Sequence, residues 1–165
     1  MSDTDAEFVE RLTQDFKEVK FKQGARRFSC QLRGSVFVIF LGPPCPKYGL
    51  LTLHELGHAL SKHKDYTVDV QRVKIESEAW ERAKTVYLKY ANEGKISLKN
   101  KNNKVKDKAK IAELLPEWDE DFVQEKLDTY RDWLHTKSRC KKCGLTCYQT
   151  EDGVYRCPRC ESFGV

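Results

Sequence analysis

The sequence predicts an α+β protein. An N-terminal helix, a small β-sheet and two helices form its core, and a small cysteine-rich module ends the chain. Apolar residues recur at every fourth position near the N-terminus, as they do on one face of a helix. A run of β-branched and aromatic residues, typical of a buried strand, follows. Two C-x-x-C pairs lie close to the C-terminus, where they indicate a metal-stabilised appendage.

The first forty residues predict one helix and three strands. Residues 3–16 carry the four-residue apolar repeat and predict an amphipathic helix. Short β-like runs follow at residues 18–22, 26–32 and 35–41, with glycines marking the turns between them. The last run, Ser-Val-Phe-Val-Ile-Phe-Leu, has no polar interruption and therefore predicts a well-buried strand.

Three further helices are predicted after a sharp break. Residues 42–46 read Gly-Pro-Pro-Cys-Pro, and no helix continues through them. Helical spacing then predicts a helix from about residue 47 to 62 and a second from about 73 to 91. Residues 95–112 are rich in Lys and Asn and predict a loop. The last helix is expected at about residues 117–136.

The overall composition predicts a polar chain of one ordinary domain with an appendage. Of its 165 residues, 39% are hydrophobic and 33% charged. We divide it into residues 1–136 and a zinc-binding module at 137–165. No apolar run approaches the roughly 18–20 residues that span a membrane, so no membrane association is expected. The first ten residues are acidic, unlike a secretory signal, and favour a cytoplasmic location.

The net charge of +5 is unevenly spread along the chain. Residues 99–110 contain six lysines and a single acidic residue, Asp107. Such a run could attract nucleic acid or another acidic surface. Lysine runs more often form solvated surface loops, and that simpler interpretation is the preferred one here.

The strongest single signal is the stretch Leu53–Leu60, which contains His54, Glu55 and His58 in the order H-E-x-x-H. On a helix, residues four apart lie on one face, so the two histidines can hold one metal ion. The carboxylate between them lies near the same edge. Two imidazole ligands and a general base are typical of zinc peptidases.

A third protein ligand is expected, because catalytic zinc usually has three. The pattern H-E-x-x-H-x-x-G-x-x-H would need glycine at position 61 and histidine at 64, where the chain has Ser61 and Lys64. His63 follows His58 by five residues, about 500° around a continuous helix. It is therefore predicted to face away from the metal, as a surface histidine or one that only supports the ligands.

Two glutamates at the head of the next helix are better candidates. At about 100° per residue, Glu76 lies near the centre of the apolar stripe of this helix, whereas Glu78 lies about 200° round, toward solvent. A carboxylate on a buried face needs a partner, and a metal ion is one. We predict Glu76 as the third ligand. The alternatives are Glu78 as the ligand, or Glu76 simply exposed at the start of the helix.

The C-terminal cysteines predict a second metal site, of the zinc-ribbon type. Two C-x-x-C pairs, thirteen residues apart, supply four thiolates for a closed tetrahedral structural zinc: Cys140, Cys143, Cys157 and Cys160. The residues between the pairs predict a hairpin around Glu151-Asp152-Gly153. Cys147 falls inside this hairpin and off the pattern, and is predicted to be an ordinary thiol.

Residues 48–60, together with the later segment Glu76-Ser-Glu-Ala-Trp-Glu-Arg-Ala83, resemble the ImmA/IrrE-type metallopeptidases. That family is similar to the gluzincins: H-E-x-x-H is followed by a helix that begins E-x-x-A. The resemblance, which covers roughly residues 5–91, implies a zincin-like core with Glu76 as third ligand. It also implies a regulatory protein, such as a transcriptional repressor, as substrate.

The resemblance has two departures, and a second family resembles the chain in its architecture. Trp80 stands where the ImmA/IrrE type commonly has Asp or Asn, and Arg82 stands where it has an aromatic residue. A zinc ribbon after an H-E-x-x-H core is similar to the SprT-like proteases, which act near DNA. Their third ligand is a histidine in a His-Gly context, and this chain has no such motif downstream.

The sequence as a whole predicts a zinc-dependent metalloendopeptidase with one catalytic and one structural Zn²⁺. Glu55 would be the general base, and Tyr48, Tyr66 or His135 could supply a donor to the oxyanion. The alternative is a non-catalytic, zinc-stabilised adaptor on the same scaffold. Nucleic acid is a conceivable partner through the lysine run or through the basic residues of the ribbon, Lys141, Lys142, Arg156 and Arg159.

Overall fold

The structure is a computed structural model and describes residues 3–64, 66–99 and 113–160. Within these ranges it is a mixed α+β chain, as the sequence predicts. Its helices are α1 (Asp3–Asp15), α2 (Tyr48–Leu60), α3 (Asp69–Lys99) and α5 (Glu120–Lys137). Its strands are β1 (Val19–Lys22), β2 (Ser29–Arg33), β3 (Val36–Phe40), β4 (Tyr148–Gln149) and β5 (Tyr155–Arg156).

The first three strands form one sheet in the order β1-β3-β2. β1 runs parallel to β3, and β2 runs antiparallel to it through the turn at Gly34. The central position of β3 explains its composition, because Val38 and Ile39 are almost completely buried. The prediction of a well-buried third strand is therefore confirmed.

Contacts along the chain define two compact units. The first comprises residues 1–63 and 78–118, and the second comprises residues 64–77 and 119–165. Helix α3 begins in the second unit and continues into the first. The sequence-based division at residue 136 stays a prediction.

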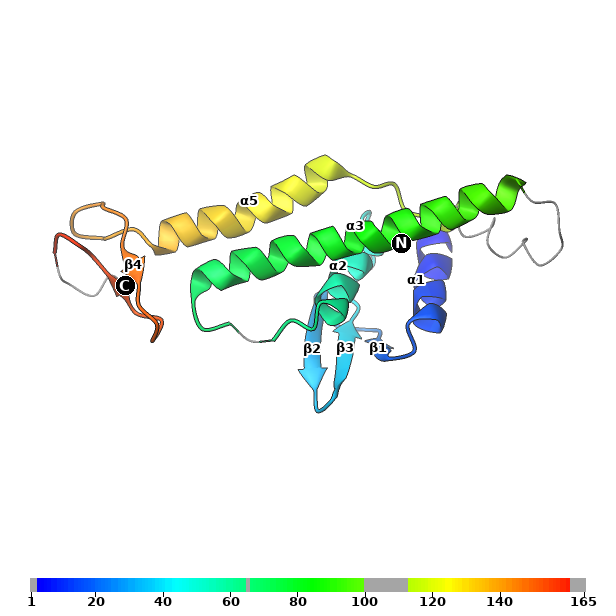
Figure 1. Cartoon of the computed structure of the whole chain (residues 1–165), viewed down its shortest axis with the longest axis horizontal. Helices are drawn as coiled ribbons and strands as arrows, with labels where there is room; N and C mark the ends of the chain where they lie inside the picture. Colours follow the sequence, from blue (N-terminus) through cyan, green and yellow to red (C-terminus); the bar gives the residue numbers. More distant parts are fainter. Residues whose placement is uncertain (1–2, 65, 100–112, 161–165) are drawn as a thin grey trace. The chain divides into compact units, whose positions relative to one another are not determined.

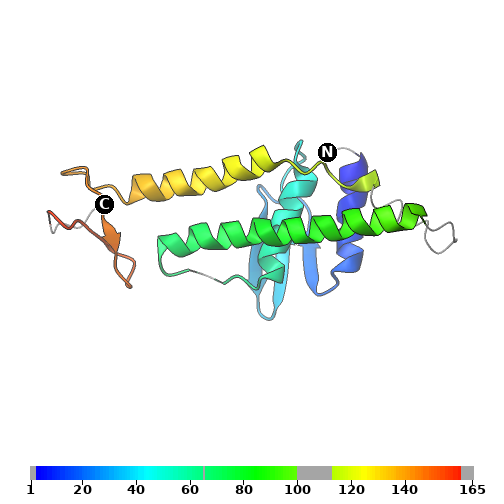
Figure 2. The same cartoon turned by 45° about the horizontal axis from the view of Figure 1, so that its top comes forward.

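The first unit is layered around α2. Figures 1 and 2 show α2 between the three-stranded sheet and α3, with α1 beside it. The rings of Phe8 on α1 and Tyr90 on α3 meet edge to face at 6.2 Å, and the Tyr90 hydroxyl donates a 2.7 Å hydrogen bond to Asp15. Leu50, Leu53 and Leu56 of α2 are fully buried. This packing fixes the helix that carries H-E-x-x-H from two sides.

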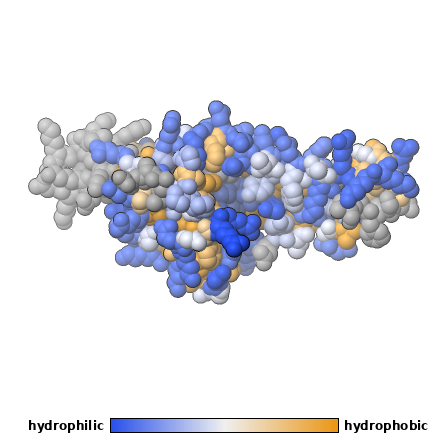
Figure 3. All heavy atoms as spheres, turned by 180° about the vertical axis from the view of Figure 1, so that it is seen from behind, coloured by the Kyte–Doolittle hydropathy of each residue, from blue (hydrophilic) through white to orange (hydrophobic). Residues whose placement is uncertain are grey.

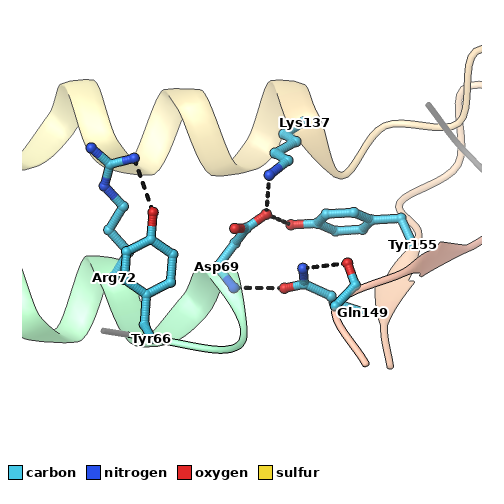
Figure 4. A network of polar contacts seen from close by, with 7 residues as sticks. Tyr66, Asp69, Arg72, Lys137, Gln149 and Tyr155 are labelled. Atoms are coloured by element: carbon cyan, nitrogen blue, oxygen red, sulfur yellow. Dashed lines mark hydrogen bonds and ion pairs between the residues drawn. The ribbon is translucent and has the colours of Figure 1, made fainter. Parts of the chain in front are cut away.

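The second unit joins the start of α3 to α5 and to the C-terminal hairpin (Figure 4). The buried carboxylate of Asp69 accepts hydrogen bonds from Lys137 at 2.7 Å and from the Tyr155 hydroxyl at 2.9 Å. The backbone N–H of Asp69 donates to the side chain of Gln149 at 2.6 Å. The Arg72 guanidinium lies over the rings of Tyr130 and Trp133 on α5. One carboxylate thus connects α3, α5 and the hairpin.

Helix α3 is longer than the sequence predicts. It was expected to end near Gly94, with a loop over residues 95–112, but it continues to Lys99. A glycine inside a helix costs only about 1 kcal/mol, and good helix formers surround it here. The predicted loop is therefore wrong for residues 95–99, and residues 100–112 lie outside the described part.

No helix among the described residues is long and apolar enough to cross a membrane. Figure 3 shows one face of the molecule, on which hydrophilic side chains predominate and apolar ones form interrupted patches. This face agrees with the high charged fraction of the sequence.

Candidate metal centres

The H-E-x-x-H residues lie on α2, where His54 and Glu55 are buried and His58 is half-buried. His54 and Glu55 are 6% and 8% exposed, and Glu76 on α3 is 8% exposed. Polar groups buried to this extent need partners. His54, His58 and Glu76 form one group of possible ligands, whose nearest ligand atoms all lie within 4.8 Å of one another.

A close approach between α2 and α3 brings these residues together. A Cβ atom placed on Gly57 would lie only 2.1 Å from the backbone oxygen of Ala79. Only glycine fits at this crossing. Glu76 precedes Ala79 by one helical turn, and His54 precedes Gly57 by the same interval, so both ligands lie one turn from the contact.

The spacing of the histidines suits a zinc ion. The Nε2 atoms of His54 and His58 are 3.2 Å apart. A tetrahedral zinc with Zn–N bonds of about 2.0 Å separates two nitrogen ligands by about 3.3 Å. Two imidazoles and one carboxylate also match the ligand set of open, catalytic zinc sites. The group therefore fits zinc in both chemistry and distance.

His63 does not face away from His58, so the predicted direction is wrong, whereas its contact with His58 agrees with the predicted alternative of a histidine that supports the ligands. The prediction assumed a continuous helix, but α2 ends at Leu60, and Lys62 adopts a left-handed conformation with φ of 55°. The amides of Lys62 and His63 donate to the carbonyls of Ala59 and His58, both at 3.1 Å. This is a Schellman end, in which the chain reverses toward its own last turn.

The reversal creates a chain of contacts behind His58. Nδ1 of His63 lies 3.0 Å from Nδ1 of His58, and Nε2 of His63 lies 3.1 Å from the carboxylate of Glu78. Glu78, which the sequence left as an alternative ligand, is thus in contact with His63, while Glu76 belongs to the ligand group. Sequence reasoning missed this contact because a chain reversal at lysine has no clear signal.

Trp80 has a place in the site that the sequence did not reveal. Its ring stacks on the imidazole of His54, with centroids 4.3 Å apart and an interplanar angle of 28°. The ring of Trp118 meets that of Trp80 edge to face, with centroids 6.4 Å apart. The aromatic ring fixes the plane of His54 by packing, at the position where the resemblance led us to expect Asp or Asn.

Cys30 and Tyr48 contribute to the surroundings of α2. Burial, together with the smaller effect of the nearby Glu55 charge, raises the pKa of the Cys30 thiol to about 12. Cys30 is therefore a neutral neighbour of the predicted base. The Tyr48 hydroxyl donates to Gln23 at 3.1 Å, so this candidate oxyanion donor is engaged elsewhere. The other two candidates, Tyr66 and His135, belong to the second unit.

The four ribbon cysteines form a second group of possible ligands, as the sequence predicts. The hairpin between the pairs is present, with β4 antiparallel to β5. The sulfurs of Cys143 and Cys157 are 3.5 Å apart, close to the roughly 3.8 Å between two thiolates on a tetrahedral zinc. The cluster fits a closed site for a structural metal.

Backbone amides at the two cysteine turns favour thiolates. Hydrogen bonds from the backbone of Cys143 and Lys142 lower the pKa of Cys140. Burial alone would raise the pKa of Cys157, but hydrogen bonds from the backbone of Cys160 and Arg159 and from the side chains of Cys143 and Cys140 outweigh it and bring the pKa to about 6. Thiolates are the form that binds metal, so the turns favour it at Cys140 and Cys157, whereas a hydrogen bond with Cys143 and burial raise the pKa of Cys160 to about 12.

Cys147 lies in the same cluster but is not one of its four ligand candidates. It is buried, and burial raises the pKa of its thiol. The neighbouring Cys157 and Cys140 raise this pKa as well, to a smaller extent. A neutral thiol packs as a small apolar group. This agrees with the sequence-based expectation of an ordinary thiol.

We compared the chain with known proteins in three ways. No protein-family model matches it, and neither the search of characterised proteins nor the search of solved structures gives a match. Function must therefore be argued from the two candidate metal centres.

Proposed function

We propose that the protein is a zinc-dependent metalloendopeptidase with a zincin-like core of the ImmA/IrrE type. One observation carries the proposal: His54, His58 and Glu76, from two helices, converge within 4.8 Å, with Glu55 next to the first histidine. A structural ion would need a fourth protein ligand, whereas three ligands leave a position open for chemistry. The ribbon would hold a second, structural zinc.

The residues of α2 and α3 divide the work of peptide hydrolysis. A bound zinc ion would lower the pKa of water toward about 7 and polarise the scissile carbonyl. The carboxylate of Glu55 accepts the proton of the attacking water and passes it to the nitrogen of the leaving amine. Stacking of Trp80 on His54 keeps the imidazole plane fixed during these steps. The substrate would be a protein, and by resemblance a transcriptional regulator.

The test combines metal content with peptide cleavage. The parent chain should bind about two zinc ions and cleave members of a mixed peptide library, with new termini identified by mass spectrometry. Glu55→Gln should keep both zinc ions, and its cleavage rate should be about 10²–10⁴-fold lower than that of the parent. Glu81→Gln, at an exposed position of α3, is the matched control. Equal cleavage by parent and Glu55→Gln, or none by the zinc-loaded parent, would refute the proposal.

A second candidate function is a zinc-stabilised module that associates with nucleic acid. It is favoured by the exposed basic residues of the ribbon: Arg139, Lys141, Lys142, Arg156 and Arg159. Such side chains attract the phosphates of nucleic acid, and this binding does not require catalysis by Glu55 on α2. The two candidates differ in their dependence on Glu55, because phosphate binding by the ribbon would be unchanged in Glu55→Gln.

A further inference from the structure

Two residues outside the group of possible ligands, His63 and Glu78, are connected to His58 by hydrogen-bonding contacts. His63 is largely buried, with 11% of its side chain exposed, whereas 42% of the Glu78 side chain is exposed. The three groups form a line from Nε2 of His58 through both rings to the carboxylate of Glu78. The direction of each hydrogen bond depends on where the ring protons lie.

Metal binding fixes the position of every proton in this line. A metal on Nε2 of His58 leaves the proton of that neutral ring on Nδ1. Nδ1 of His63 must then accept it, which places the proton of the second ring on Nε2. That Nε2–H donates to the carboxylate of Glu78, which is an acceptor only. No donor faces another donor, and one set of tautomers satisfies all three groups.

We propose that His63 is a positioning residue for the metal site: it accepts the Nδ1–H of His58, and Glu78 holds His63 in the required tautomer. The inference rests on the metal site of the proposed function, but not on catalysis. Ligand histidines commonly donate their second N–H to a carbonyl or carboxylate, which fixes the ring and increases its basicity. Here an imidazole mediates between His58 and the carboxylate.

Two features give His63 this position. The left-handed residue Lys62 reverses the chain, and the amide of His63 donates to the carbonyl of His58. The two residues are therefore joined through both backbone and side chain. Glu78 lies on α3, so the line of contacts also connects the end of α2 to the helix that supplies Glu76.

Cobalt(II) binding tests the proposal without any substrate. The parent should bind two cobalt ions, and thiolate charge-transfer absorption reports the ribbon site separately from the other. His63→Ala should weaken the site at His54 and His58 by about 10–100-fold and leave the ribbon absorption unchanged. His135→Ala, which removes an exposed histidine of α5, is the matched control for cobalt affinity.

Glu78 provides a graded second test. Glu78→Gln keeps an oxygen acceptor for His63 and should bind cobalt within about threefold of the parent. Glu78→Ala removes the acceptor and should be weaker than Glu78→Gln, by less than the effect of His63→Ala because water reaches this half-exposed position. Parent-like affinity in His63→Ala would overturn the proposal.

Nitrogen NMR of the zinc-loaded parent gives an answer even if a variant fails to fold. The ring of His58 should be protonated on Nδ1 and the ring of His63 on Nε2. A proton on Nδ1 of His63 would overturn the inference. A chain that binds one metal ion, in the ribbon only, overturns it together with the site. A chain that binds two ions without cleaving peptides refutes the peptidase alone, and the affinities still decide the role of His63.

Discussion

Gly57→Ala tests whether the crossing of α2 and α3 builds the metal site. The substitution adds one methyl group at the point where a Cβ would lie 2.1 Å from the backbone oxygen of Ala79. An ordinary van der Waals contact between a Cβ and an oxygen lies at about 3.4 Å or more, so the two helices must move apart by about 1 Å. The obstacle is backbone, and no rotamer change can remove it.

Two opposing effects set the size of the change. Alanine is favoured over glycine inside a helix by about 1 kcal/mol, which would stabilise α2. Overpacking against a rigid neighbour costs about 1–3 kcal/mol, with more when backbone must move, and separating the helices exposes apolar surface around Ala79 and Ala83. We expect a net loss of about 2 kcal/mol in the free energy of unfolding.

The metal site should respond more strongly than stability does. Moving α3 away carries Glu76 with it, whereas His54 and His58 stay on α2. Urea denaturation and cobalt titration of Gly57→Ala should show reduced stability and weakened binding at the histidine site, with ribbon absorption unchanged. Gly49→Ala is the control, because its Cβ would meet side-chain atoms of Asp5 and Pro116 at 3.0 Å, a much milder contact than the backbone oxygen at 2.1 Å. A Gly57→Ala chain that is more stable and binds two cobalt ions would refute the helix-crossing argument.

Two further predictions concern the ends of helices. Lys62→Gly should raise the free energy of unfolding, measured in urea, by about 0.5–1 kcal/mol, since glycine adopts a positive φ without strain; a loss of stability would contradict the Schellman assignment. Burial tends to raise the pKa of Asp69, but hydrogen bonds from Lys137 and Tyr155 outweigh it and lower the pKa below 3.8. The contribution of Asp69 to the free energy of unfolding is therefore fully present above about pH 4. It is lost as the pH falls through the lowered pKa of the folded state. Asp69→Asn should lose this part of the acid dependence in pH-dependent unfolding, and an unchanged profile would refute it.

The sequence predicted those parts of the fold that depend on local pattern. The β-like runs placed all three strands of the first sheet to within a few residues of their observed bounds. The signal is clearest for β3, because burial of a strand requires a continuous apolar composition. Spacing alone brought the two cysteine pairs together. The end of α3 was missed, because the cost of Gly94 is small against the neighbouring helix formers.

The ligand group was also accessible from sequence, for a physical reason. H-E-x-x-H places two possible ligands by helical period, and the phase of Glu76 on the buried stripe indicates a possible third. His63 and Trp80 were not accessible in this way. The position of His63 depends on one backbone dihedral at Lys62, and the stacking of Trp80 depends on the depth at which two helices cross. Neither property has a periodic signature.

The crossing point also explains why two glutamates of one helix turn contact the histidine cluster. Ala79 lies about 60° from Glu76 and about 100° from Glu78 around α3, so the two carboxylates flank the contact line. On α2, His54 and His58 lie about 60° and 100° from Gly57, both on the same side of it. His54 and Glu76 are both buried, whereas Glu78 is partly exposed and contacts His63 just after the chain reversal at Lys62. Removing the carboxylate, as in Glu78→Ala, would therefore break the contact with His63 while leaving His54, His58 and Glu76 in place.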